Sequence, residues 1–183
     1  MRTIMLLSVF AATGLFFFVQ AGKAGEWNQE LTLTFNHPVA IPGHVLEPGT
    51  YVFELGLGNT SQYENIVRVY NKGKDHLYGM FLTVPDDRLT RSNKPILEFS
   101  ETPPGSPEAI YAWFYPQDKT GHEFVYPRSE ALRLAKANNR PVASMPDNTN
   151  IANEDALKQA HVDAVTPGGK EVETITVFGT PAH

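Results

Sequence analysis

The densest group of side chains able to bind a ligand is an aromatic segment at residues 109–115. Because side chains alternate between the two faces of a β-strand, Tyr111, Trp113 and Tyr115 are expected on one face. A row of rings with polar tips can stack on sugar rings or on the side chains of a peptide. The residues between them are also apolar, so the alternative is a central strand covered on both faces.

Histidine is the next candidate for chemistry, because its imidazole serves as a metal ligand and as a general base near neutral pH. The histidines of the chain are His37, His44, His76, His122, His161 and His183. None of them has the short spacing that is typical of two metal ligands on one element. A small exported enzyme or metal-binding protein built on the first four would therefore require the fold to bring them together.

The familiar catalytic motifs are missing from the sequence. It contains no cysteine, which removes thiol chemistry and zinc–thiolate sites. Ser106 lacks the Gly-x-Ser-x-Gly frame of a nucleophile elbow, and the adjacent acids Asp86 and Asp87 fit a turn. We therefore predict no catalytic residue, no metal ligand and no cofactor, and favour a protein that is not an enzyme.

Basic side chains recur on the one strongly helical segment, residues 129–137. Arg133, Lys136 and Arg140 follow a spacing that places them on one helix face, with Arg128 nearby. This face could contact an anionic surface such as the phosphates of a cell envelope. The alternatives are a solvated face or a docking site for the acidic C-terminal segment.

The N-terminus has the layout of a secretory signal peptide. Arg2 precedes an apolar run over residues 4–19, and small residues follow it. We predict a signal peptide at residues 1–24, with cleavage after Ala24 or, as the alternative, after Ala21. The run is shorter than the roughly 20 residues of a transmembrane helix, so no membrane span is expected after processing. The predicted location is periplasmic or secreted.

The charge balance restricts the partners. The 183-residue chain has 15 basic and 20 acidic residues, a net charge of −5. Nucleic-acid binding requires many phosphate contacts from lysine and arginine, so this composition disfavours it.

Short segments of alternating apolar and polar residues, separated by glycine and proline, predict a mainly β domain at residues 25–140. The predicted strands cover residues 31–35, 39–41, 50–55, 65–70, 76–84, 96–99, 109–115 and 122–126. Most successive strands are close enough to pair as antiparallel hairpins, which favours a β-sandwich or an open barrel. The helix at residues 129–137 follows, with Ser129 as its N-cap.

Residues 141–183 are expected to form an acidic, loosely ordered tail, with six acidic and two basic residues and few large apolar ones. A weak helix at residues 154–161 and a last strand at residues 172–178 are expected within it.

Three segments together resemble a family of small secreted β-rich bacterial proteins of unknown function. They are Leu46-Glu-Pro-Gly-Thr-Tyr-Val-Phe53, Ala112-Trp-Phe-Tyr-Pro116 and Gly121-His-Glu-Phe-Val-Tyr-Pro127. The resemblance covers about residues 35–140. It implies export and a β domain with a short helix after the Tyr-Pro pair, and it carries over no functional residue.

These observations favour an exported, non-catalytic binding or structural module of the cell envelope or exterior. Its expected partners are a carbohydrate, a peptide or another envelope protein. One alternative is a self-assembling extracellular subunit that donates the strand at residues 172–178 to a neighbour. The other is the histidine-based enzyme or metal-binding protein.

Overall fold

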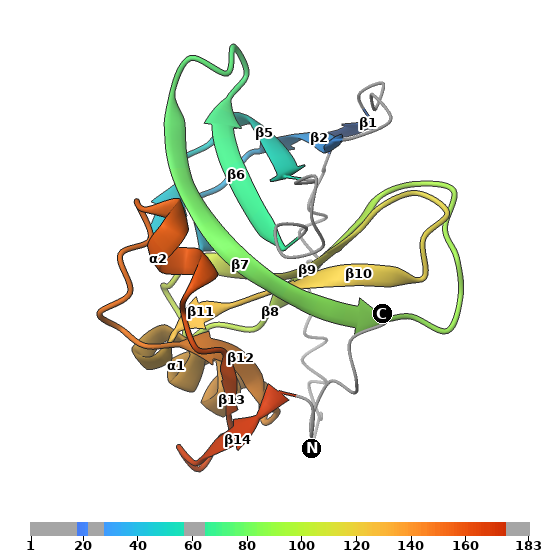
Figure 1. The fold of residues 1–183 in the computed structure, drawn as a ribbon. Coiled ribbons are helices and arrows are strands. Elements are labelled where there is room, and N and C mark those ends of the chain that lie inside the picture. Colours follow the sequence, from blue (N-terminus) through green and yellow to red (C-terminus); the bar gives the residue numbers. More distant parts are fainter. Residues whose placement is uncertain (1–17, 22–27, 57–64, 175–183) are drawn as a thin grey trace, which may run out of the picture.

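Alternating apolar and polar residues build most of this chain into a mainly β fold, as the sequence predicts. The fold is seen in a computed structural model that describes residues 18–21, 28–56 and 65–174 (Figure 1). Within these residues, the strands of the larger sheet are β1 (Phe18–Ala21), β2 (Asn28–Phe35), β3 (Val39–Ile41), β4 (His44–Leu46), β5 (Gly49–Gly56), β6 (Ile66–Asn71), β7 (Leu77–Asp87), β8 (Ile96–Ser100), β9 (Glu108–Phe114) and β10 (Thr120–Phe124).

The strand β7 holds this sheet together. The sheet order is β1-β2-β5-β6-β7-β10-β9-β3-β4, and β8 pairs with β9. The first part of β7 pairs with β6 up to Leu82, and its second part pairs with β10 from Thr83 onward. Figure 1 shows β7 as one long curved strand between the β5–β6 region and the β9–β10 region. Both regions contribute to a common hydrophobic core, so the arrangement is an open, sandwich-like one.

The core follows the predicted period-2 pattern. In β2, Leu31, Leu33 and Phe35 are buried, and the threonines between them are partly exposed. Phe53 of β5 and Val69 of β6 continue the same cluster. The pairings of β6 with β7 and of β9 with β10 are antiparallel, as predicted. The sequence pattern did not predict the parallel pairing of β3 with β9, which brings distant segments together.

The helix α1 (Arg128–Asn138) confirms the predicted helix and ends at Asn139, whose left-handed conformation has φ of 50°. The expectation that Ser129 is the N-cap is wrong. Pro127 occupies that position without a side-chain hydrogen bond, and the Ser129 N–H donates to Oδ1 of Asp147 at 2.8 Å. The carboxylate of Asp147 is thus supplied from outside the helix to a backbone N–H of its first turn.

Residues 142–173 are more regular than the expected loose tail. They contribute to a second sheet made of β11 (Tyr126–Pro127), β12 (Val142–Met145), β13 (Asp163–Val165) and β14 (Glu171–Glu173), with α2 (Glu154–Lys158) between β12 and β13. All four residues of β12 are buried, and β12 packs on α1. Small apolar side chains such as Ala143 and Ala164 suffice for a core at this close approach, so a low content of large apolar residues did not prevent order.

The expected features of the tail are found in part. The predicted weak helix is present in shortened form as α2. The predicted last strand is represented by β14, which pairs with β13 of the same chain, and residues 175–178 lie outside the described residues.

The β3–β4 hairpin is fixed to both α1 and the C-terminal segment through its turn at Pro42 and Gly43. Gly43 has φ of 71°, a left-handed conformation that is costly for other residues. A Cβ at this position would lie 2.5 Å from Cδ1 of Ile151. The Gly43 N–H donates to Oε2 of Glu130 at 3.2 Å. The turn therefore requires glycine for both its conformation and its packing.

We expect Gly43→Ala to lower the free energy of unfolding by about 1–2 kcal/mol, because alanine must adopt the left-handed conformation. Gly79→Ala is the matched control, since nothing lies within 4 Å of a Cβ at Gly79. Urea unfolding of both variants measures the difference. Equal stabilities would show that the turn does not constrain the hairpin.

Candidate functional site

The aromatic segment predicted as a binding platform is buried. Trp113 has no exposed surface, Tyr111 is 8% exposed, and Tyr115 is partly buried against the main core. The structure therefore shows the alternative, a central strand covered on both faces. Trp113 packs with His122, with ring centroids 5.9 Å apart, and its Nε1 has no hydrogen-bond partner within the described residues.

A β-bulge overturns the expectation that Tyr111 and Trp113 share a face. The register between β8 and β9 shifts at Glu98 and Phe99, which leaves Tyr111 as the extra residue of β9. Tyr111 consequently joins the cluster of Ala112, while Trp113 belongs to the main core. Simple alternation could not reveal this irregularity.

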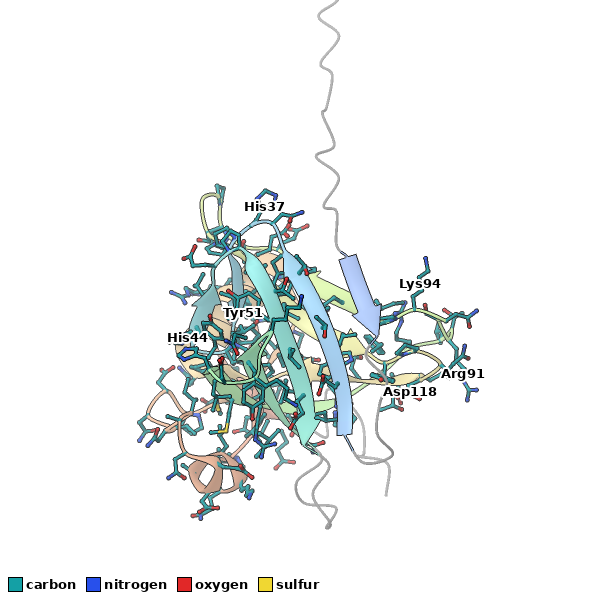
Figure 2. The ribbon with its side chains drawn as sticks, turned by 90° about the horizontal axis from the view of Figure 1, so that it is seen from above. His37, His44, Tyr51, Arg91, Lys94 and Asp118 are labelled. Carbon is teal, nitrogen blue, oxygen red and sulfur yellow. The ribbon has the colours of Figure 1, made fainter. Side chains whose placement is uncertain are left out.

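The histidines are dispersed. His122 lies on β10 beside Trp113, and His76 stacks edge-on against Tyr78 with centroids 4.6 Å apart. Figure 2 shows His37 and His44 well separated from one another. Within the described ranges, no group of three or more histidine or acidic side chains is placed to hold a metal ion.

The candidate site is instead a half-open cleft of about 400 Å³ between the β3–β4 hairpin, the loop at residues 102–107 and α1. Its floor follows from strand register: Ala40 pairs with Val45 on one side and with Ala109 on the other. Directly paired residues of neighbouring strands project from the same face. The side chains of two alanines and one valine are short, so they leave space above this face of the sheet. That space is the cleft.

The walls of the cleft are rigid and mostly apolar. Pro103 and Pro107 line it from the loop, and Leu134 lines it from α1. Tyr126 is fixed beneath by its hydroxyl, which donates a hydrogen bond to the carbonyl oxygen of Ile110 at 2.6 Å and lies 3.4 Å from the carbonyl oxygen of Ala40. Proline rings and an anchored tyrosine change little in shape, which favours a preformed site.

Polar residues also line this cleft, and Thr102 and Ser106 of the loop are among them. His44 belongs to β4, and Glu130 and Arg133 belong to α1. Glu130 accepts the N–H of Gly43, which joins the helix to the hairpin turn. Arg133 is exposed, and it forms no ion pair or hydrogen bond with any part of the chain that the structure describes.

The basic side chains predicted to form one face diverge in the structure. Arg128 pairs with Glu171 of β14, which matches the alternative that the acidic C-terminal segment docks there. Arg140 lies over the ring of Tyr111, with its guanidinium carbon 3.5 Å from the ring centroid. Arg133 alone of these three lines the cleft.

A buried carboxyl group connects the larger sheet to the second sheet. Oε2 of Glu123 accepts the hydroxyl of Tyr111 at 2.5 Å, and its Oε1 accepts the N–H of Ala143 at 3.2 Å. Glu123 has no exposed surface, and burial raises its pKa to about 7 despite these hydrogen bonds. Asp86 repels its charge and Arg140 attracts it. The sequence suggested no role for this residue.

His122, the neighbour of Glu123 on β10, responds to burial in the opposite sense. It pairs with Trp113 in the register, and burial lowers the pKa of its imidazole to about 4. Its Nδ1 lies 3.4 Å from Oγ1 of Thr83. One strand therefore presents a neutral imidazole to one face and a carboxyl group that titrates near neutrality to the other.

Comparison with known proteins gives no relative: no protein-family model, curated protein or solved structure matches this chain. Among the residues that the structure describes, no helix is both long enough and apolar enough to span a membrane.

Sequence reasoning missed the cleft, although two local signals marked its borders. The prolines at residues 102–107 are typical of a rigid surface loop, and the Pro-Gly pair at residues 42–43 is typical of a turn. What the sequence could not supply was the parallel pairing of β3 with β9, which places Ala40 beside Ala109.

We expect Glu123 and His122 to contribute to the pH dependence of stability with opposite signs. The raised pKa of Glu123 favours the folded state at low pH, and this contribution is lost as pH rises from about 4.5 to about 7. The lowered pKa of His122 has the reverse effect between about pH 4 and 6.5. Each contribution is of the order of 3 kcal/mol, so they largely cancel in the wild type.

The measurement is the unfolding free energy in urea at a series of pH values. Relative to wild type, Glu123→Gln should gain stability as pH rises from 4.5 to 7, and His122→Gln should lose it from 4 to 6.5. Parallel curves for all three proteins would contradict the opposed titration of these groups.

We expect Trp113→Ala to cost about 4 kcal/mol of stability, because it removes a fully buried indole from the core. Tyr115→Ala, two residues further along, is the comparison. It should lose less stability, since part of Tyr115 is exposed. Thermal or urea unfolding distinguishes them. A Trp113→Ala variant of normal stability would restore the interpretation of this residue as a binding group.

Proposed function

We propose that this chain is an exported, non-catalytic binding module of the cell envelope or exterior, and that the cleft beside α1 is its ligand site. The observation that carries the proposal is the preformed cleft of about 400 Å³ with an apolar floor and a few charged groups. This volume and this mixture of groups are typical of small-ligand sites.

Export is supported by the N-terminal sequence. A basic residue, an apolar run at residues 4–19 and small residues up to Ala24 match the three regions of a signal peptide. The strand β1 falls inside this segment, so processing after Ala24 would leave β2 at the edge of the larger sheet.

A non-catalytic role is supported by the position of Glu123, the carboxyl group whose pKa is raised to about 7. A general acid or base must reach its substrate directly or through one water molecule. Glu123, whose pKa lies near neutrality, has no exposed surface and does not line the cleft. Its two hydrogen bonds join β9 to β12, which is a structural use of the carboxyl group.

The cleft also favours one kind of partner among those expected. Proline, alanine, valine and leucine make up about half of its lining residues, and the large indole of Trp113 is buried elsewhere. A small apolar group, such as a peptide side chain, fits this lining better than a carbohydrate does.

We expect Ala40→Leu to abolish ligand binding without unfolding the protein, because the larger side chain would occupy the cleft. Ala137→Leu, on the exposed part of α1, is the matched control. The measurement is native mass spectrometry of each protein recovered from the exported fraction. A bound mass on wild type and control, but not on Ala40→Leu, is the expected result. The same bound mass on all three proteins, or none on the wild type, would contradict the proposal.

A further inference from the structure

We infer that the cleft binds a ligand with a compact apolar body and a single carboxylate, and that Arg133 binds the carboxylate. This inference rests on the proposed function of the cleft and specifies the ligand class. It follows from three features of the site: the low apolar floor, the unpartnered guanidinium and the occupied carboxylate of Glu130.

The floor sets the apolar part of the ligand. Ala40, Val45 and Ala109 form one cross-strand row, and Val45 is 48% exposed although it is a large apolar residue. Pro103 and Pro107 have no backbone N–H to offer a ligand. A ligand that covers Val45 removes apolar surface from water, which favours a branched aliphatic or small ring group.

Arg133 sets the charge of the ligand. Arg68 pairs with Glu154 at 2.7 Å, and Arg128 pairs with Glu171. Among the described residues, exposed Arg91 also lacks an ion pair or hydrogen bond, but it does not line the cleft. Arg133 lines the cleft and has no such partner in the described part of the chain. A guanidinium matches the two oxygens of a carboxylate in a bidentate pair, which lysine cannot do.

Glu130 restricts the ligand to a single negative charge. It stands one helical turn before Arg133, and the Gly43 N–H holds its carboxylate at the hairpin turn. Repulsion from this carboxylate grows with the charge of the ligand, so a doubly charged phosphate is disfavoured more than a carboxylate, whose single charge the guanidinium of Arg133 balances. Both a free small acid and the C-terminal residue of a peptide carry the required chemistry.

The test uses 4-methylpentanoate and its neutral amide as probes, with binding measured by calorimetry on the protein from the exported fraction. We expect the acid to bind wild type about tenfold more tightly than the amide. Arg133→Gln should remove this difference. Lys136→Gln, an exposed position on α1 outside the cleft, should preserve it and serves as the control for lost charge. A second pair of probes is acetyl-Ala-Ala-Leu with a free or an amidated C-terminus. It tests whether the bound carboxylate belongs to the C-terminal residue of a peptide or to a free small acid.

The outcomes separate the two proposals. If acid and amide bind equally well and Ala40→Leu abolishes both, the requirement for a carboxylate is overturned. The cleft would then remain the ligand site. An acid preference that survives Arg133→Gln would overturn the role of Arg133. Failure of all four probes to bind at millimolar concentration would overturn the ligand class, whereas the proposed function of the cleft is overturned only if native mass spectrometry finds no bound mass that depends on Ala40.

Discussion

The structure depends on the strand β7, which forms hydrogen bonds with two different parts of the larger sheet. β7 pairs with β6 over its first part and with β10 over its second, so its curvature brings these neighbours around a common core. The contact of Phe81 on β7 with Phe124 on β10, at 4.4 Å between ring centroids, lies inside this core. The next elements are positioned from β10: β11 and α1 follow within a few residues, and β12 returns to pair with β11.

The second sheet is attached to the first through a polar contact as well as an apolar one. Val125, Met145 and Leu157 belong to one cluster that joins the two parts. Beside it, Glu123 accepts hydrogen bonds from both Tyr111 and Ala143. A buried carboxyl group costs free energy unless it is hydrogen-bonded or protonated, and here both occur because its pKa is near neutrality. The contact therefore favours the observed position of β12 relative to β10 over positions that would leave the carboxyl group of Glu123 without these hydrogen bonds.

Most of the fold could be predicted from the sequence, and most of the site could not. Alternation of apolar and polar residues identified β2, and the closeness of the predicted strands at residues 65–70 and 76–84 identified the β6–β7 hairpin. The strands β4, β12 and β13 were not predicted, because each has only three or four residues and depends on pairing with distant segments. The face of Tyr111 was predicted wrongly, since a bulge is set by the packing of two strands rather than by one strand's pattern.

The aromatic segment and the cleft show why the largest side chains of the chain do not mark the candidate site. Large rings such as Trp113 exclude water best in the interior, where they fill the space between the sheets and leave no room for a ligand. Space for a ligand arises where side chains are small and the neighbouring backbone is held rigidly. Ala40 and Ala109 meet this condition, because the parallel pairing of β3 with β9 places them side by side beneath a proline-lined loop. In the proposed site, the short side chains of two alanines leave space for a ligand, and we assign selectivity to the one arginine beside them.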